Sequence, residues 1–350
     1  MSLTAGVDIG GTKAAAVLIQ DGVPLSHRFW LEHSRSGAAR LTLSEKALAA
    51  VDGVLGEARL TRASLDACGV AIAGLVSADR ATVVHAAVLG ESRLGLGRQL
   101  SAILGTSVSV VNDANATLFG HLHGAAGAEP EIRDVLLLAL GTGVGGALAV
   151  SGGIVEGANG YAAELGHIVV DYDDERVCLC GSRGCIEQFA CGRGLSELVA
   201  LDPPPPDSIV TRRPDGGIPN EEVVAAAAAG DDWALRLFAF CGTRLGRAIA
   251  QLCTALDPEL VVIGGTFGHA AGRWLLPAAT QELRTRWPFA GIRDVPPITM
   301  DGIGPYAGAI GAGLIADRER AVPARTREGC DEHRGEEEAR SWRSNPSGSV

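Results

Sequence analysis

The stretch AGVDIGGTKAAAVLIQ, residues 5–20, consists of an apolar run, a pair of glycines and a second apolar run. It predicts a strand, a tight turn and a second strand, because short apolar runs separated by glycines are typical of buried hairpins. The stretch DVLLLALGTGVGGALAVSGG, residues 134–153, follows the same plan and ends in a glycine-rich turn. Two such copies, about 130 residues apart, predict a duplicated α/β architecture.

The rest of the chain alternates between strand-like and helical patterns. Strands are predicted over residues 69–77, 106–111 and 260–265, and helices over 43–60, 115–127, 221–256 (with a break near Gly230) and 307–316. Six prolines exclude regular structure from residues 201–220, which we expect to form a surface loop. Residues 318–350 are charged and poor in apolar side chains, which is typical of a disordered tail.

The charge and composition of the chain limit its possible partners. It has 30 Lys and Arg against 41 Asp and Glu, a formal net charge of −11. This acidity argues against general binding to nucleic acid or to anionic membranes, which require a positive surface. No apolar run approaches the roughly 20 residues that span a bilayer, and the N-terminus lacks the apolar core of a signal peptide. We therefore expect a cytoplasmic protein that acts on small molecules.

The glycine turns are candidates for binding phosphate. The sequence GTGVGG, residues 141–146, matches the dinucleotide fingerprint, but the strand-like ALAV follows it instead of the helix which that site requires. Glycine permits close backbone approach to phosphate oxygens, and the threonine in each turn adds a hydroxyl donor. Asp8 precedes the first turn and is an oxygen ligand suited to Mg²⁺. Plain hairpin turns are the alternative, although two turns of matching layout and a third at 264–265 favour a nucleotide.

The candidate nucleotide-binding residues are therefore taken from these three turns. Lys13 can contact phosphate or simply face solvent, because the lysine of a P-loop has no counterpart in a turn of this type. The full set is Asp8, Gly10, Gly11, Thr12, Lys13, Gly141, Thr142, Gly143, Gly264 and Gly265.

The stretch ELGHIVVDYDDERVCLCGSRGCIEQ, residues 164–188, contains one histidine and three cysteines. One imidazole and three thiolates form a closed tetrahedral zinc site, which leaves no open position to activate water. We therefore predict a structural Zn²⁺ held by His167, Cys178, Cys180 and Cys185. The acidic DYDDE within the loop argues against a nucleic-acid finger. The metal would fix Glu164 and Glu187, at the two ends of the stretch, relative to each other.

Several of these motifs together resemble the ROK family of sugar kinases and related repressors. They are DIGGTK at 8–13, NDAN at 112–115, LGTGVGG at 140–146, ELGH at 164–167, CLCGSRGCIEQ at 178–188 and DPELVVIGG at 257–265. The resemblance covers about residues 5–316 and implies an actin-like ATPase (ribonuclease H-like) fold, in which two α/β domains close over ATP and a hexose. The expected domains are a smaller one at 1–113, completed by about 300–317, and a larger one at 114–300.

The resemblance also assigns roles to residues of the site. From its position between a strand and a helix, Asp113 is equally suited to capping the helix and to serving in the site. The family match makes it the general base that deprotonates the sugar hydroxyl. The residues that would orient the sugar are Gly74, Asn112, Asp113, Glu164, His167 and Glu187, and ATP with Mg²⁺ at Asp8 would be the donor.

The sequence predicts an ATP-dependent hexose kinase, with glucose as the first candidate substrate and a homodimer or homotetramer as the assembly. N-acetylglucosamine, N-acetylmannosamine and fructose kinases are alternatives, as is polyphosphate as donor. An inactive zinc-stabilised sugar-binding or regulatory protein is the non-enzymatic alternative. A ROK repressor would need a helix-turn-helix domain ahead of residue 8. The chain departs from the family in having no Asn between Asp79 and Asn112, and Thr266 in place of a common glycine.

Overall fold

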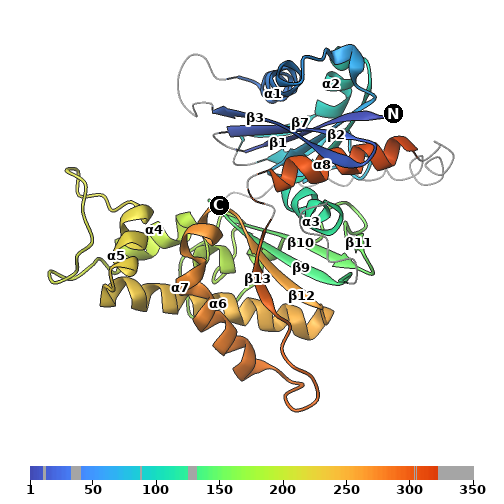
Figure 1. The fold of residues 1–350 in the computed structure, drawn as a ribbon. Coiled ribbons are helices and arrows are strands. Elements are labelled where there is room, and N and C mark those ends of the chain that lie inside the picture. Colours follow the sequence, from blue (N-terminus) through green and yellow to red (C-terminus); the bar gives the residue numbers. More distant parts are fainter. Residues whose placement is uncertain are drawn as a thin grey trace, which may run out of the picture.

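The computed structural model describes residues 1–10, 13–32, 41–86, 89–124, 132–302, 304 and 306–321. These residues form two five-stranded mixed sheets, each covered by helices (Figure 1). The chain thus has the α/β architecture that the paired hairpins predict.

The first sheet has the strand order β3-β2-β1-β4-β8. Its strands are β1 (Leu3–Ile9), β2 (Lys13–Gln20), β3 (Val23–Glu32), β4 (Ala67–Ile72) and β8 (Ser107–Asn112). Strands β1, β2 and β3 pair antiparallel, whereas β1, β4 and β8 pair parallel. The carboxyl ends of β1, β4 and β8 therefore lie at one edge of the sheet.

The second sheet repeats this topology in the order β11-β10-β9-β12-β13. Its strands are β9 (Val135–Leu140), β10 (Val144–Val150), β11 (Gly153–Ile154), β12 (Leu260–Gly264) and β13 (Ile298–Met300). The first three pair antiparallel, and β9, β12 and β13 pair parallel. The duplicated architecture is confirmed. A small third sheet, made of β5 (Leu75–Val76), β6 (Val83–Ala86) and β7 (Glu91–Leu94), follows β4.

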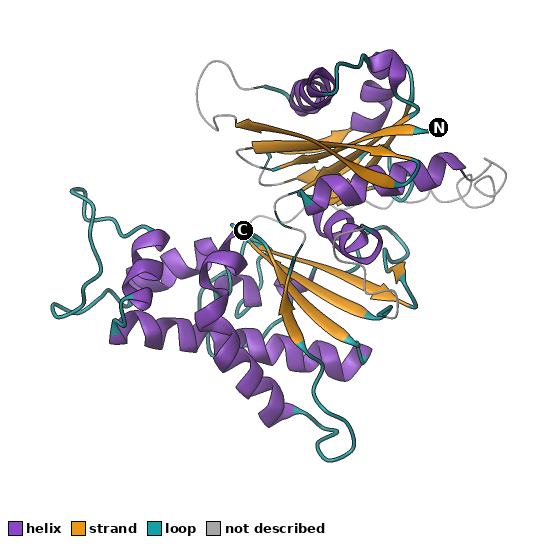
Figure 2. Cartoon of the chain, in the orientation of Figure 1, coloured by secondary structure: helices purple, strands orange, loops and turns teal. Residues whose placement is uncertain are grey.

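Helices cover both faces of each sheet (Figure 2). The helices are α1 (Leu43–Glu57), α2 (Leu96–Leu104), α3 (Asp113–His123), α4 (Gly192–Leu201), α5 (Asn220–Ala228), α6 (Asp232–Leu256), α7 (Thr266–Arg286) and α8 (Ala307–Ala321). The predicted break falls at Gly230, whose φ of 86° ends α5 before α6 begins. Residues 202–219 contain no helix or strand, as the prolines predict.

Two helices lie between the sheets. Side chains of α3 enter the core of both halves, since Leu118 packs with Val135 of the second sheet and Ala116 with Val111 of the first. Helix α8 returns the end of the described chain to the first sheet and crosses α3, where a Cβ on Gly311 would overlap the carbonyl of Ala116. Helix α3, which begins with Asp113, thus packs against both halves.

Helix α8 is longer than the sequence predicts. It runs to Ala321, so residues 318–321 are helical and do not belong to the predicted tail. Their polar side chains are anchored, because Glu319 forms an ion pair of 2.7 Å with Arg80 and also accepts from the Ser109 hydroxyl. Residues 322–350 lie outside the described residues. Among the described helices, none is long and apolar enough to cross a membrane.

Candidate active site

The candidate site begins at the edge where β4 and β8 end. Asn112, the last residue of β8, caps α3 because its Oδ1 accepts from the backbone N–H of Ala114 (2.9 Å) and of Asn115 (3.1 Å). Its Nδ2 donates to the carbonyl of Gly74 at 3.2 Å. One side chain therefore starts the helix and ties the ends of two neighbouring strands together.

Asp113 is the first residue of α3 and is partly exposed. Burial raises the pKa of its carboxyl group, while hydrogen bonds from backbone N–H groups, including that of Ala114 to Oδ1 at 2.9 Å, act in the opposite direction. Asn112 provides the helix cap, so the competing role considered for Asp113 is already filled. Asp113 is left as a desolvated carboxylate at the edge of the sheet.

Asp8 lies near the end of β1, on the same sheet. Burial, with repulsion from Asp113 added, raises the pKa of its carboxyl group to about 7, and Lys13 lowers it only in part. The first turn of α8 packs on this carboxylate, since a Cβ on Gly308 would come 2.7 Å from Asp8 Oδ2. A half-buried acid whose charge is only partly offset fits a divalent cation that arrives with phosphates.

The first glycine turn is described at both of its ends. The backbone N–H of Gly10 donates to the carbonyl of Lys13 at 2.8 Å, which closes the turn between β1 and β2. The ammonium group of Lys13 lies 4.6 Å from the centre of the Trp30 ring, a cation–π contact. Gly11 and Thr12, two of the predicted nucleotide-binding residues, lie outside the described residues.

The second glycine turn joins β9 to β10 and is held by α4. The N–H of Gly141 donates to the carbonyl of Gly143 at 2.9 Å, and the carbonyl of Gly141 accepts from Gly192 N–H at 2.9 Å. Gly265, with a φ of 82°, begins α7 so close to this turn that a Cβ would overlap the Leu140 carbonyl. Gly264, which ends β12, and Thr142 complete this group, so two of the three predicted turns lie side by side.

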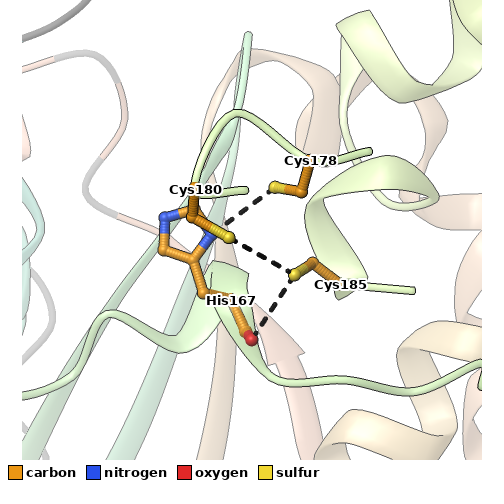
Figure 3. A group of neighbouring side chains, drawn as sticks. All are labelled: His167, Cys178, Cys180 and Cys185. Atoms are coloured by element: carbon orange, nitrogen blue, oxygen red, sulfur yellow. Dashed lines mark hydrogen bonds between the residues drawn. The ribbon is translucent and has the colours of Figure 1, made fainter. Parts of the chain in front are cut away.

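The predicted zinc ligands converge (Figure 3). The ligand atoms of His167, Cys178, Cys180 and Cys185 all lie within 4.8 Å of one another. His167 Nδ1 is 3.6 Å from Cys178 Sγ, and Cys180 Sγ is 3.7 Å from Cys185 Sγ. In a tetrahedron with Zn–S of about 2.3 Å and Zn–N of about 2.0 Å, neighbouring ligand atoms are about 3.5–3.8 Å apart. The cluster therefore fits a structural zinc ion, bound through Nδ1 of the histidine.

Residues 164–165 and the start of α3 both pack on the start of β10, since a Cβ on Gly145 would come 3.5 Å from Ala114 Cβ and one on Gly146 would come 2.4 Å from Leu165 Cγ. Burial raises the pKa of the Glu164 carboxyl group, His167 lowers it, and Asp113 and Glu187 raise it further. Interactions of this kind require the charged groups to lie close together. The preceding residue, Ala163, has a φ of 68°, a left-handed conformation that turns the chain into Glu164. The candidate base and the candidate sugar ligands thus share one region.

Glu187 is held by contacts that sequence patterns do not reveal. It is 9 % exposed, and its Oε2 accepts from the N–H of Val144, at the end of the second glycine turn, at 3.1 Å. Its Oε1 accepts from the guanidinium of Arg193 at 2.6 Å. Arg193 was not predicted as a site residue, since nothing in its own sequence neighbourhood indicates its partner.

Arginines also anchor the zinc loop to the body of the second half. Arg244 of α6 pairs with Asp171 at 2.7 Å and stacks over Phe240, 3.5 Å from the ring centre. Arg176 pairs with Asp174 at 2.8 Å, and its guanidinium lies 4.7 Å from the centre of the Phe189 ring. These contacts therefore hold residues 164–188 in place independently of a bound metal ion.

Comparisons with known proteins show which family the chain is similar to. The sequence pattern that defines the ROK family matches residues 4–319. The glucokinase of Streptomyces coelicolor is 32% identical over 325 residues, covering 90% of this chain and 98% of that one. The N-acetylmannosamine kinase of Salmonella typhimurium is 30% identical over 270 residues, covering 77% of this chain and 84% of that one.

Among solved structures, a ROK family glucokinase from Streptomyces griseus, in complex with glucose and AMPPNP, superimposes with a TM-score of 0.75. It is 30% identical in sequence, and the match covers 91% of this chain and all of that one. The two-sheet architecture is thus the actin-like ATPase fold.

Proposed function

Because the chain belongs to the ROK family, we propose that it is an ATP-dependent hexose kinase with glucose as its preferred acceptor. The observation that carries the proposal is that the start of β10 contacts three candidate segments: a Cβ on Gly145 would come 3.5 Å from Ala114, next to Asp113, and one on Gly146 would come 2.4 Å from Leu165, next to Glu164. The N–H of Val144, in the same strand, donates to Glu187. A base and three polar side chains gathered at one place suit a polyhydroxylated substrate whose hydroxyl must lose a proton.

Asp113 is the proposed general base. Phosphoryl transfer to a sugar requires a carboxylate to accept the hydroxyl proton as the phosphorus–oxygen bond forms. The pKa of Asp113 is raised by burial, which makes the carboxylate a better proton acceptor than an exposed aspartate. Asn112 and the Gly74 segment next to it, with Glu164, His167 and Glu187, would orient the ring so that one hydroxyl faces Asp113.

The donor nucleotide is assigned to the glycine turns. Gly10, Gly11, Thr12 and Lys13 of the first turn would approach the phosphates with Gly141, Thr142 and Gly143 of the second, and Gly264 with Gly265 would face the nucleoside end. Asp8 would hold Mg²⁺, directly or through water, and when bound this ion would offset the charge of the transferring group. The partly compensated charge of Asp8 supports this role.

The zinc ion is proposed to have a structural role. All four of its ligands come from the chain, so it offers no position for a reacting oxygen. His167 faces the cysteines with Nδ1, and its second ring nitrogen points away from them, where it would contact a sugar hydroxyl (Figure 3). The metal would thereby hold a sugar ligand in place without taking part in the chemistry.

An ADP-release assay with a panel of sugars tests the proposal. With ATP and Mg²⁺, glucose should give the highest kcat/KM. Asp113→Ala should lower kcat by about 10²–10⁴-fold, the usual contribution of a general base. It should leave the chain folded and its zinc content unchanged. Asp207→Ala, at an exposed acid of the proline-rich loop, is the matched control. Full activity of Asp113→Ala, or no ATP-dependent turnover of any sugar, would refute the assignment.

N-acetylmannosamine is the second candidate acceptor, since a kinase for that sugar is 30% identical over 270 residues, against 32% over 325 residues for the glucokinase. The panel should therefore contain glucose, fructose, N-acetylglucosamine and N-acetylmannosamine, each tested with ATP and with polyphosphate. The ratio of kcat/KM values decides between them. A preference for an N-acetylated sugar would replace glucose in the proposal and leave Asp113 in its role.

A further inference from the structure

The carboxylate of Glu187 lies directly against the second glycine turn. Its Oε2 accepts from Val144 N–H at 3.1 Å, and a Cβ on Gly143 would come 2.5 Å from the same oxygen. The residue is 9 % exposed, so water screens this charge poorly. A sugar-side acid thus stands beside the turn that is assigned to the phosphates of the donor.

This arrangement poses an electrostatic problem. A negative charge in a medium of low dielectric repels a polyanion over several ångströms. If Glu187 remained uncompensated, it would weaken the binding of the nucleotide whose phosphate is to be transferred. A fixed cation beside the carboxylate resolves the conflict.

Arg193, in the first turn of α4, is placed to supply that cation. One guanidinium nitrogen lies 2.6 Å from Glu187 Oε1, and the other lies 3.2 Å from Glu197. The backbone of the same turn is bonded to the glycine turn, since Arg193 N–H donates to the Thr142 carbonyl at 3.3 Å. The arginine is therefore attached to the phosphate turn and to the acid at once.

We propose that Arg193 is a positioning residue that neutralises Glu187 beside residues 141–144, so that a sugar-binding carboxylate and the phosphates of a nucleotide can occupy neighbouring places. The inference rests on the proposed function, because it takes the second glycine turn as a phosphate site. The alternative is a purely structural role, in which the ion pair of Arg193 with Glu187 only holds the loop to α4.

The two roles separate in a charge-balance experiment. Isothermal titration calorimetry would measure the Kd of MgADP and of MgAMPPNP for the full chain in the absence of sugar. Arg193→Met should weaken binding about tenfold, the effect expected of one poorly screened charge several ångströms away. The double variant Glu187→Gln with Arg193→Met, which removes both charges, should return the Kd to within about threefold of the wild-type value. Arg236→Met removes an exposed arginine of α6 and controls for net charge.

Each result has a definite meaning. Wild-type affinity in Arg193→Met overturns the inference, and so does a double variant that binds as weakly as Arg193→Met, because that pattern indicates lost structure. If Arg193→Met alone loses zinc or does not fold, Glu187→Gln decides: it should bind nucleotide as tightly as the wild type or more tightly, and weaker binding overturns the inference. A wild-type chain that binds no nucleotide would instead contradict the proposed function itself.

Discussion

Asp8 and Asp113 stand at the carboxyl ends of β1 and β8, on either side of β4, and the charge of Asp113 makes Asp8 harder to ionise. Burial is the larger cause, and together the two effects raise the pKa of Asp8 to about 7. The two carboxyl groups, which we propose as the Mg²⁺ ligand and the general base, are thus separated by the end of one strand. Each depends on the state of the other, so their titration is a property of the pair.

The raised pKa of Asp8 predicts a specific dependence of stability on pH. The native state holds this proton up to about pH 7, whereas the unfolded chain loses it near 3.8, the ordinary pKa of an aspartate. The stabilisation from the neutral carboxyl is therefore complete below the unfolded pKa and is lost as pH rises through the native one. We therefore compare the free energy of unfolding of Asp8→Asn with that of the wild type, without Mg²⁺ or nucleotide. The difference should shift in favour of the variant by about 2 kcal/mol as the pH rises from 5 to 8.

Urea unfolding at both pH values measures this difference. Asp21→Asn, at the exposed turn between β2 and β3, is the control and should follow the wild-type pH dependence. An identical pH dependence in Asp8→Asn and wild type would show that Asp8 is ionised in the native chain at neutral pH.

Removal of the zinc ion should loosen the loop and weaken the binding of sugar. We expect one zinc per chain in the purified protein by elemental analysis. Cys180→Ser should lose most of it and lower the free energy of unfolding by several kcal/mol, because binding energy at a structural site is folding energy. The Kd for sugar should rise, since His167 and Glu187 lose their fixed placement. Cys253→Ala, a buried cysteine of α6 outside the cluster, should retain the metal. A Cys180→Ser variant with a full complement of zinc would contradict the ligand assignment.

Asn112 combines two roles that substitutions can separate. Asn112→Ala removes the cap of α3 and should cost about 1 kcal/mol of stability as well as activity. Asn112→Asp keeps an oxygen for the N–H groups of Ala114 and Asn115, but loses the donor to Gly74 and adds a charge beside Asp113. It should keep the cap, and so lose less stability than Asn112→Ala, and yet have a lower kcat at neutral pH. Equal activity of Asn112→Asp and wild type would mean that Asn112 serves only as a cap.

The parts of the fold that the sequence predicts are those coded locally. The two hairpins follow from apolar runs around glycines, and the cluster of His167 with Cys178, Cys180 and Cys185 follows from ligand types within one short stretch. Helix α7 was missed because glycines and Pro277 interrupt its pattern, although the helix continues through the proline. Strand β3 was missed because polar residues leave it without an alternating pattern, and only pairing with β2 makes it a strand.

The contacts that hold the site in place could not be predicted from the sequence. Arg244 meets Asp171 across 73 positions of chain, and Arg193 meets the turn at Thr142 only because α4 packs on it. No local pattern marks such partners, since each arginine satisfies helix propensity equally well without one. Sequence motifs thus identify the groups that carry the chemistry, and tertiary packing determines which groups hold them.

The crossing of α8 over α3 provides a final prediction, because sequence and packing predict opposite results there. Gly56 of α1 and Gly311 of α8 are both helical, so propensity alone predicts that alanine stabilises each by up to about 1 kcal/mol. A Cβ on Gly56 would meet no atom within 4 Å, whereas a Cβ on Gly311 would overlap the carbonyl of Ala116. Gly56→Ala should therefore stabilise the chain in urea unfolding, and Gly311→Ala should destabilise it by about 3 kcal/mol or more. Gly311→Ala should also lower kcat, because α3 begins with Asp113 and the first turn of α8 packs on Asp8. If both substitutions stabilised the chain alike, the close approach of α8 to α3, and with it the placement of both acids, would be wrong.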